Sequence, residues 1–505
     1  MIRRRSLAIV LLAIPACLCV AGKADCTSAA GYRRLAETCV RKGEYAKAAD
    51  YYRHEAAIYR RLGDPNAAKV EEMKAERWST EIEVFEDAQP DRKALLGLYT
   101  GAKLEPVYGC YLGAFLDKDE RVNQAAFFTK VRRTREEAFS EIVGKPLATS
   151  YMYRRYGVDF PTEWARALCA KGIIPHIAWE PNGGLERVQS DGYLERFARS
   201  AASCGGPIFI RFAGEMNGDW TRYHGDPELY KEKFRLVHDV MERLAPNAAM
   251  IWCVNHIPEH NVDDYYPGDK YVDWVGVNFY SVIYHDNDTS RPGLHECPTS
   301  FLKSVYRKYA AKKPIAICEY GASHMAALDR VDRPEFAIEK LSQLLSAIPR
   351  LYPRVKLVDI FDCNNLKHAV PSRQLNNYCV TDDERVLAAF KRAVESDYYL
   401  TRAYPDSRAQ QQLPAHIRKL DSGCILSGVA HLSSWVKTYQ PYPTVVYTLD
   451  GKQLARLTAP GEYRAELDTG RFPKGKHVLA VTVLDSRGRQ AGRKEIRVEF
   501  RAGKD

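Results

Sequence analysis

Short apolar runs alternate with amphipathic segments through the middle of the chain. The runs are rich in Ile, Val and Phe and end at Gly, Pro or polar residues, which is typical of buried strands. The intervening segments, such as 193–202 and 227–244, repeat their apolar residues at helical spacing. The predicted strands span 94–99, 145–152, 172–179, 207–212, 249–255, 272–280, 314–319 and 355–361.

Eight such strand–helix units over residues 93–400 predict a (β/α)8 TIM barrel. The competing architecture is an open doubly wound sheet, which normally has a Gly-rich phosphate loop after its first strand. Gly97 and Gly101 match that loop poorly, so the pattern favours the barrel.

Residues 27–85 show helical spacing of apolar positions, punctuated at Gly43 and Gly63. The motifs Tyr32-x-x-Leu35 and Gly43-x-Tyr45-x-x-Ala48 resemble a tetratricopeptide-type helical pair. The resemblance covers about one and a half repeats, whereas an independent solenoid needs about three or more. Two interpretations stay open, a helical hairpin packed against the next domain and a repeat that binds a protein partner in the cell envelope.

The pattern after residue 400 differs from that of the barrel and predicts a separate domain. Residues 401–425 are rich in polar residues and proline and are expected to form a linker. From 426 to 505 short alternating runs are separated by turn signals, including Asp450-Gly451, a strong hairpin cue. This pattern predicts a small all-β sandwich of immunoglobulin-like type.

The N-terminus has the pattern of an export signal. Three arginines at 3–5 precede an apolar run at 7–20, which is too short for a comfortable membrane span. We therefore expect residues 1–24 to be a signal peptide and the chain to be exported, secreted or periplasmic. The sequence before Cys17 is similar to a lipoprotein processing site, so lipid anchoring at Cys17 stays open.

Composition narrows the function classes. The formal charge of +10 comes from basic residues scattered among acids, with no basic stripe, so no nucleic-acid partner is expected. The 13 cysteines include no Cys-x-x-Cys pair, and His295, Glu296 and His324 lack metal-ligand spacing, so neither a metal nor a cofactor is predicted. In an oxidising compartment the local candidates for disulfides are Cys363 with Cys379 and Cys26 with Cys39.

Two predicted strands end in glutamate. Glu215 follows the strand at 207–212, and Glu319 ends the strand at 314–319. The C-terminal ends of barrel strands face one active site, so these two carboxyl groups are expected to meet. Glycoside hydrolysis requires such a pair, one to protonate the leaving oxygen and one to attack or to activate water.

Other residues near these strand ends suit sugar binding. Trp179 is a candidate platform for the apolar face of a pyranose, and Trp220 and Tyr223 are candidates for a subsite wall. Asn217 offers an amide for a sugar hydroxyl, and Arg211 offers a cation beside the carboxyl groups. Plain packing is the alternative role for Trp220 and Tyr223, and an ion pair inside the barrel is the alternative for Arg211.

The motif Arg211-x-x-x-Glu215-Met-Asn-Gly-x-Trp220 resembles the fourth-strand motif of glycoside hydrolase family 26, the β-mannanase-like family. The segments 274–280 and 317–321 resemble its sixth- and seventh-strand motifs. The resemblance implies a barrel that retains anomeric configuration, with Glu215 as acid/base and Glu319 as nucleophile. It also implies that Tyr280 hydrogen-bonds the nucleophile and that the substrate is a β-linked mannan, glucan or xylan.

One position departs from the family motif. The family usually has histidine directly before the acid/base, where this chain has Gly214. That difference leaves hydrolysis in place but weakens the case for mannan; His256 or His224 are candidates to replace the missing side chain. The sequence thus predicts an exported retaining β-glycosidase acting on a polysaccharide. The alternative is a non-catalytic glycan-binding or exopolysaccharide-assembly protein on the same scaffold.

Overall fold

The computed structural model describes residues 28–88, 91–128, 133–404, 416–439, 442–458 and 463–501. The chain divides into two compact units, Met1–Ser79 and Thr80–Asp505. The predicted signal segment, with Cys17, and also Cys26 lie outside the described residues. Among the residues described, no helix combines the length and the apolar character needed to cross a bilayer.

Within the first unit, residues 28–79 are described and form helices, as expected. They are α1 (Ala29–Lys42), α2 (Tyr45–Arg61) and α3 (Pro65–Trp78). Gly43 ends α1 in a left-handed conformation with φ 71°, and Asp64 caps α3 by accepting from the Ala67 amide. The helices end at Trp78, so the predicted boundary at 85 is too late. The tetratricopeptide character stays a prediction.

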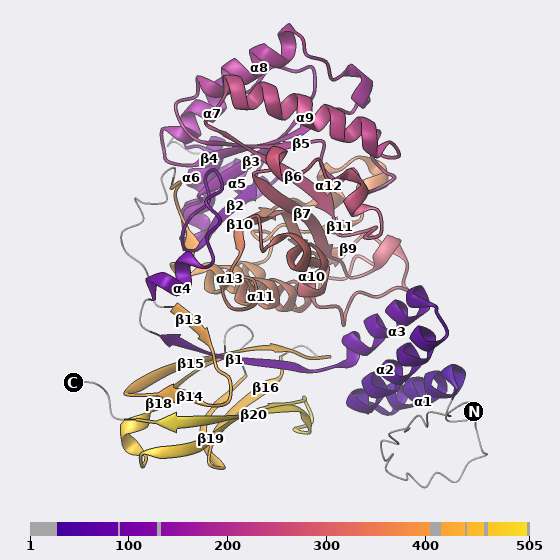
Figure 1. The fold of residues 1–505 in the computed structure, drawn as a ribbon, viewed down its shortest axis with the longest axis vertical. Coiled ribbons are helices and arrows are strands. Elements are labelled where there is room, and N and C mark those ends of the chain that lie inside the picture. Colours follow the sequence, from indigo (N-terminus) through magenta and orange to yellow (C-terminus); the bar gives the residue numbers. More distant parts are fainter. Residues whose placement is uncertain are drawn as a thin grey trace, which may run out of the picture. The chain divides into compact units, whose positions relative to one another are not determined.

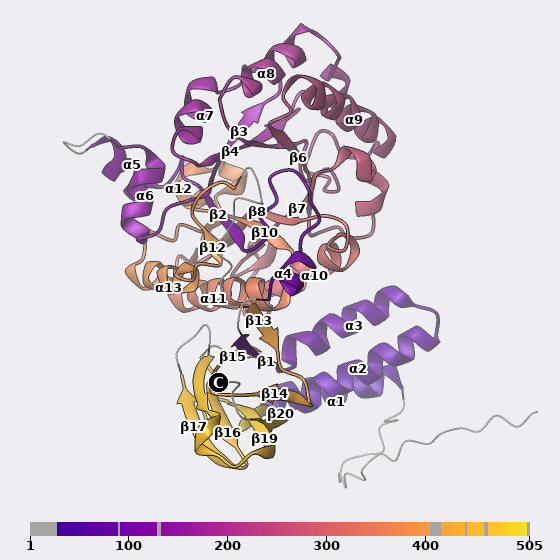
Figure 2. The same cartoon turned by 60° about the vertical axis from the view of Figure 1, so that its left-hand side comes forward.

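The second unit contains a closed parallel barrel, which confirms the predicted (β/α)8 fold (Figure 2). Each strand pairs with its predecessor, and the last strand pairs back with the first, Leu357 opposite Tyr111. The eight barrel strands are β2 (Cys110–Phe115), β3 (Thr149–Arg155), β4 (Ile174–Glu180), β5 (Ile208–Phe212), β6 (Ala248–Asn255), β7 (Trp274–Ser281), β8 (Ile315–Ala322) and β10 (Val355–Phe361).

Helices surround this barrel in Figure 2. They are α5 (Glu120–Phe127), α6 (Arg135–Val143), α7 (Thr162–Cys169), α8 (Gly192–Ala202), α9 (Pro227–Leu244), α10 (Pro298–Tyr309), α11 (Pro334–Leu351) and α13 (Glu384–Val394). After β6 the connection contains the 3-10 turns η2 (Val262–Tyr265) and η3 (Asp269–Tyr271) instead of an α-helix. The mouth carries the short helix α12 (Asn365–His368) and a two-residue ribbon of β9 (Met325–Ala326) and β11 (Asn376–Asn377).

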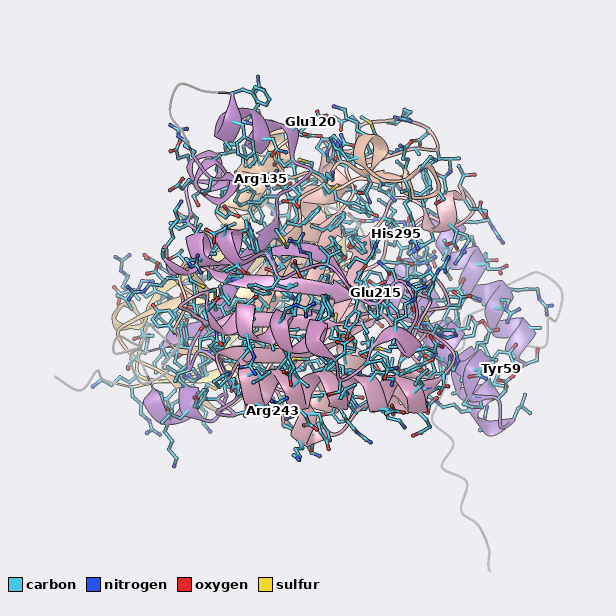
Figure 3. All side chains as sticks on the ribbon, turned by 90° about the horizontal axis from the view of Figure 1, so that it is seen from above. Tyr59, Glu120, Arg135, Glu215, Arg243 and His295 are labelled. Carbon is cyan, nitrogen blue, oxygen red and sulfur yellow. The ribbon has the colours of Figure 1, made fainter. Side chains whose placement is uncertain are left out.

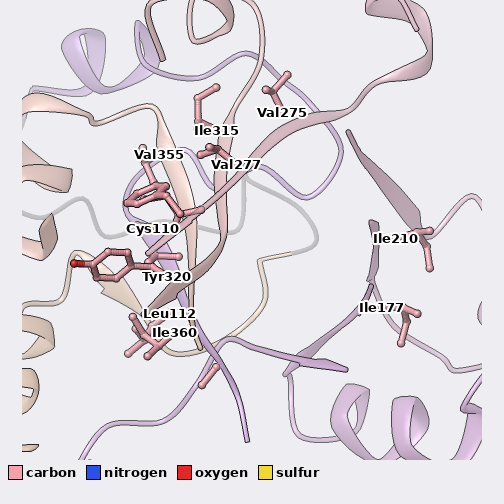
Figure 4. Close-up of a cluster of buried hydrophobic side chains, with 14 of the residues drawn as sticks. Cys110, Leu112, Ile177, Ile210, Val275, Val277, Ile315, Tyr320, Val355 and Ile360 are labelled. Atoms are coloured by element: carbon pink, nitrogen blue, oxygen red, sulfur yellow. The ribbon is translucent and has the colours of Figure 1, made fainter. Parts of the chain in front are cut away.

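Alternation along the strands builds two cores. Ile208 and Ile210 of β5 belong to the large cluster beneath the surrounding helices, whereas Phe209 belongs to a separate cluster. Successive side chains of a strand point to opposite faces, so this division separates the helix-facing side from the barrel interior. Figure 4 shows part of the large cluster, including Ile177 and Ile210.

The first predicted barrel strand, 94–99, is wrong. Residues 92–96 form the short helix α4 (Arg92–Leu96), which Asp91 caps by accepting from the Ala94 amide. The true first strand is β2, which contains Gly113 and so resembles a turn by composition. Gly113 is required there, because a Cβ at this position would lie 1.8 Å from both Thr149 Oγ1 and Asp359 Oδ1, two buried polar groups of the barrel interior.

The predicted sandwich is present and takes a strand from before the barrel. One sheet has the order β13-β1-β15-β18 and the other β14-β20-β19-β16-β17. The strands are β1 (Glu81–Ala88), β13 (His416–Lys419), β14 (Cys424–Leu426), β15 (Val429–Lys437), β16 (Thr444–Leu449), β17 (Lys452–Leu457), β18 (Tyr463–Asp468), β19 (Gly475–Leu484) and β20 (Gln490–Phe500). Both sheets contribute to one apolar core. Figure 1 shows β1 lying between β13 and β15.

The sandwich and the barrel share an interface through α11. The Arg350 guanidinium donates to Ser433 Oγ at 3.2 Å, and the Trp435 indole donates to the Gln343 carbonyl at 3.0 Å. Fifteen of the residues of α11 are buried, because β8 and β15 both pack against it. The predicted linker is also shorter than expected, because β12 (Tyr399–Leu400) pairs with the barrel and β13 and β14 lie in the sandwich.

Candidate active site

Loops at the C-terminal ends of the barrel strands surround a cleft of about 740 Å³. Glu215, labelled in Figure 3, and Glu319 both line it, as the sequence predicted. Because β5 and β8 are separated by two other strands around the ring, the two carboxyl groups approach the cleft from different sides.

Glu319 lies within β8 and is only 5% exposed. Three donors surround its carboxyl group. Oε1 accepts from the Tyr153 hydroxyl at 2.6 Å and from Arg211 Nη2 at 2.5 Å, and Oε2 accepts from the Tyr280 hydroxyl. Hydrogen bonds and an adjacent cation stabilise the ionised form of a carboxyl group. The three donors therefore fix the Glu319 carboxyl group in position in the cleft.

Glu215 follows β5 in a tight turn and is half-buried. Its Oε1 accepts from Asn278 Nδ2 at 2.7 Å, and its Oε2 accepts from the Trp220 indole at 2.7 Å. Both donors are neutral. The turn holds Ala213 and Glu215 at φ 47° and φ 62°, which non-glycine residues rarely adopt. Such strain persists where the surrounding structure fixes it, and here it aims the Glu215 side chain into the cleft.

Asn278 connects the two carboxyl groups. Its Oδ1 accepts from Arg211 Nη1 at 3.2 Å while its Nδ2 donates to Glu215. Arg211 Nη2 donates to Glu319, and the Arg211 guanidinium lies over the rings of Tyr151 and Tyr153. A continuous hydrogen-bonded path thus runs from Glu215 through Asn278 and Arg211 to Glu319, which fixes their relative positions.

The surroundings of Glu215, the acid/base candidate, change its pKa. Burial raises the pKa of Glu215, and the negative charge of Glu319 raises it further. The hydrogen bonds from Asn278 and Trp220 act in the opposite direction and lower that pKa. The net shift is upward, which favours the protonated form that a general acid needs. Burial also raises the pKa of Glu180, a third carboxyl group in the cleft.

The cleft contains two of the predicted aromatic wall residues. Trp220 is 40% exposed and lies against Gly218, where a Cβ would lie 2.2 Å from its ring. Tyr223 lines the cleft and donates from its hydroxyl to the Gly214 carbonyl at 2.7 Å. Trp220 therefore presents a ring face for a sugar, and Tyr223 supports the turn that carries Glu215.

Two predicted sugar-binding residues are buried instead. Trp179 is fully buried and stacks on Phe197 of α8, with ring centroids 3.7 Å apart, so it cannot be a platform. Asn217 is also fully buried. Its amide donates to the Asn255 and Pro258 carbonyls and accepts from the Asn255 amide, which uses its polar atoms to hold the loop after β6.

Sequence reasoning missed Tyr153 and Asn278. Tyr153 lies in β3, the second barrel strand, whereas Glu215 follows the fourth strand and Glu319 lies in the seventh, and no motif points to Tyr153. Asn278 is two residues before Tyr280 on the same strand, so the period of two places both on one face. The alternation of faces along this strand is therefore the sequence signal that could have identified Asn278 as a site residue.

The glycine before Glu215 is not required by the backbone. A Cβ at Gly214 would meet Arg211 and Cys253 carbons at 3.7 and 3.8 Å, which is ordinary contact. The site therefore has room for the first atom of a side chain there. Of the two candidate replacements, His256 lines the cleft, whereas His224 does not border it.

Residues after β10 divide between the cleft and the interior. Asn365 lines the cleft, but Asp362 is buried and accepts from the Val380 amide.

Asp362, Asp119 and Cys379 place their possible ligand atoms within 4.8 Å of one another. Burial and Asp119 raise the pKa of Asp362 well above its usual range. Val122 and Thr381 donate to Asp119, so this buried cluster has internal hydrogen bonds.

The predicted disulfide between Cys363 and Cys379 is wrong, because both thiols are free. Cys363 lies beside Asn365, and Cys379 beside Thr381. Among the residues described, Cys169 and Cys204 have a close thiol contact instead, with sulfurs 3.6 Å apart.

Comparison with known proteins confirms the resemblance that the motifs suggested. Residues 192–293 match the model of glycosyl hydrolase family 26. The matched segment contains Glu215 and Asn278 and ends before Glu319.

Individual proteins are similar over parts of the chain. Endoglucanase H of Acetivibrio thermocellus is 27% identical over 212 residues, 37% of this chain and 23% of that protein. The beta-1,3-xylanase TXYA of a Vibrio species is 29% identical over 108 residues, 20% of this chain and 23% of that protein. The matches therefore span less than a quarter of either relative. A GH26 beta-mannanase structure from Bacteroides ovatus aligns with TM-score 0.41 and 13% identity, covering 58% of this chain and 90% of that one.

Proposed function

We propose that the chain is a retaining glycoside hydrolase that cleaves a β-linked polysaccharide by double displacement. The observation that carries the proposal is the contrast between two carboxyl groups in one cleft. Glu319 has three donors, one of them a cation, whereas Glu215 has two neutral donors and a raised pKa. Two carboxyl groups whose environments separate their protonation states are what acid-assisted glycoside cleavage requires.

The roles follow from these environments. Glu319 attacks the anomeric carbon, and Glu215 protonates the departing glycosidic oxygen, which leaves a covalent glycosyl-enzyme. Glu215, now ionised, then removes a proton from water as that water attacks the same carbon, and the bond between this carbon and Glu319 breaks to release the sugar. Arg211 and the hydroxyls of Tyr153 and Tyr280 hold Glu319 in position for the first step. The Trp220 ring supports a sugar beside Glu215.

The relatives support a β-linked polymer as the substrate, since their names include an endoglucanase and a xylanase. Gly214 replaces the histidine that the family usually has before the acid/base, so we extend the candidate substrates from mannans to glucans, xylans and exopolysaccharides. The apolar N-terminal run with its preceding arginines supports export as part of the proposal.

The test is a panel of β-linked polysaccharides digested with the wild type, Glu319→Ala and Glu215→Ala. We expect Glu319→Ala to lose at least about 10³-fold in kcat. For Glu215→Ala we expect a loss of about 10²- to 10⁴-fold on polysaccharide, and a smaller loss on an aryl glycoside whose leaving group needs no proton. NMR of early products would show retained anomeric configuration. Unchanged activity in Glu319→Ala would overturn the assignment. Glycan binding without any product would favour the alternative of a binding module.

A further inference from the structure

Two arginines line the cleft in addition to Arg211. Arg222 belongs to the loop after β5, and Arg373 to the loop after β10. These strands are the fourth and the eighth of the closed barrel, and strands four positions apart in a ring of eight lie on opposite sides. Both side chains are exposed. The cleft is therefore bordered by one guanidinium on each of two opposing walls.

Neither guanidinium has a side-chain hydrogen bond or ion pair with any residue that the structure describes, whereas other charged groups of the cleft are paired. Arg211 binds Glu319, His285 binds Glu296 at 2.6 Å, and Asp286 binds Arg291. The exceptions are Glu180 and Glu215, which accept hydrogen bonds from neutral donors and whose pKa values burial raises. The walls thus carry two guanidinium groups that have no side-chain partner among the described residues.

Each arginine lies on the wall of one catalytic carboxyl group. Arg222 lies between Trp220, which donates to Glu215, and Tyr223, which donates to the Gly214 carbonyl. Arg373 lies on the wall of Tyr378, whose ring is 5.1 Å from that of Tyr280, the donor to Glu319. A polymer lying across both carboxyl groups would therefore pass both arginines.

Resting on the proposed hydrolase function, we infer that the substrate is a β-linked polysaccharide bearing carboxylate groups, which Arg222 and Arg373 bind on the two sides of the cleaved bond. The planar guanidinium donates two parallel hydrogen bonds to a carboxylate, a geometry that a neutral sugar does not match. Uronic acid residues supply such groups without changing the backbone. The specificity of this cleft is thus directed to acidic polymers.

The test uses pairs of oligosaccharides that share a backbone and differ at C6. They are β-1,4-glucuronan against cello-oligosaccharides, and β-1,4-mannuronan against manno-oligosaccharides. Binding to Glu319→Ala is measured by calorimetry and cleavage by the wild type. We expect the acidic member of at least one pair to bind about 10-fold or more tightly than its neutral partner, with affinity that falls as salt rises.

The variants are Arg222→Gln and Arg373→Gln, with Arg243→Gln as the control. Arg243 is an exposed arginine of α9 that is absent from the cleft lining and labelled in Figure 3, so its loss changes net charge equally. Each cleft variant is expected to weaken binding of the acidic oligomer by about 10- to 100-fold. The cleft variants should bind the neutral partner as tightly as the parent protein does. The control variant should bind both oligomers as tightly as the parent protein does.

The outcomes separate this inference from the proposed function. Cleavage of acidic oligomers with unchanged kinetics in both cleft variants would overturn the inference and leave the hydrolase in place. Arginine-dependent binding of acidic oligomers without cleavage would support the inference and overturn the hydrolase. Equal binding of sulfated cello-oligosaccharides would overturn the carboxylate specificity, and absence of binding to any acidic oligomer would overturn the inference as a whole.

Discussion

The Asn278 side-chain amide donates to Glu215 Oε1 at 2.7 Å, while its oxygen is held by Arg211. The bond from Arg211 fixes which end of the amide faces the glutamate, so Asn278 can act on Glu215 only as a donor. The Trp220 indole donates to the other oxygen of the same carboxyl group. Both donors stabilise the carboxylate and therefore oppose the raised pKa that burial produces.

Replacing Trp220 by Phe should move the pH profile upward. Loss of the indole donor removes a group that lowers the pKa of Glu215, so this pKa rises further. The general acid must be protonated, so the alkaline limb of kcat/KM against pH shifts to higher pH. The measurement is that profile for the wild type and Trp220→Phe, with Trp164→Phe on α7 as the control. An alkaline limb that stays in place or moves to lower pH would contradict the assigned role of the indole.

Tyr153 should matter to turnover more than its neighbour Tyr151. Tyr153→Phe removes a hydroxyl that donates to Glu319 at 2.6 Å, and a hydrogen bond to a charged group contributes about 1.5–3 kcal/mol. We expect kcat/KM to fall by about 10- to 100-fold. Tyr151→Phe is the matched control, because the Tyr151 hydroxyl is buried without a hydrogen-bond partner among the described residues. Equal effects of the two variants on kcat/KM would refute this role.

Replacing Trp179 should lower stability, whereas replacing Trp220 should weaken substrate binding. Trp179 is buried against Phe197, so Trp179→Ala should lower the free energy of unfolding by about 3–5 kcal/mol. Trp220 is 40% exposed, so Trp220→Ala should change stability little and raise KM for an oligosaccharide. Chemical denaturation and steady-state kinetics on both variants check this. A stable Trp179→Ala protein with a raised KM would restore Trp179 as a sugar platform.

The structure places the start of the second unit before the barrel. A chain beginning at Thr80 retains β1, the strand between β13 and β15, whereas one beginning at Asp91 lacks it. Ile82, Val84 and Phe85 of β1 are buried, and burial of each contributes about 1.5–3 kcal/mol. The shorter chain should therefore be less stable by about 5 kcal/mol. Calorimetry compares the two chains, and equal unfolding temperatures would show that β1 is dispensable.

Cys169 and Cys204 should be the pair most readily oxidised. Their sulfurs are 3.6 Å apart, and the hydrogen bond from Cys169 lowers the pKa of Cys204 to about 7. A thiolate attacks an external disulfide, so oxidised glutathione should convert this pair to a disulfide while the glutathione disulfide is reduced to two glutathione thiols. Peptide mapping of the wild type and Cys169→Ser measures this. Persistence of both free thiols, or a bridge between Cys363 and Cys379, would contradict the prediction.

Much of the site followed from sequence because it is local. The apolar run 207–212 predicts a strand, which the structure shows as Ile208–Phe212 with every side chain buried, and a carboxyl group beyond the end of such a strand faces the barrel mouth. Glu215, Glu319, Trp220 and Tyr280 were therefore placed correctly in the cleft. Trp179 and Asn217 occupy similar positions in their motifs, yet neighbours from α8 and the loop after β6 cover them. The local sequence pattern does not show whether a distant segment will cover a residue.

The sequence by itself determined the strand and helix periodicity, the barrel, the sandwich and the two glutamates, because each depends on residues close together in the chain. The tertiary structure alone decided which strands complete each sheet and which polar atoms meet. Strand β1 pairs with segments more than 300 residues later, and Tyr153 binds Glu319 across 166 positions. Such contacts depend on how whole elements pack, because hydrogen bonds between distant segments form only after the barrel has closed. Arg222 and Arg373 likewise face one cleft only because the first and last strands of the barrel pair.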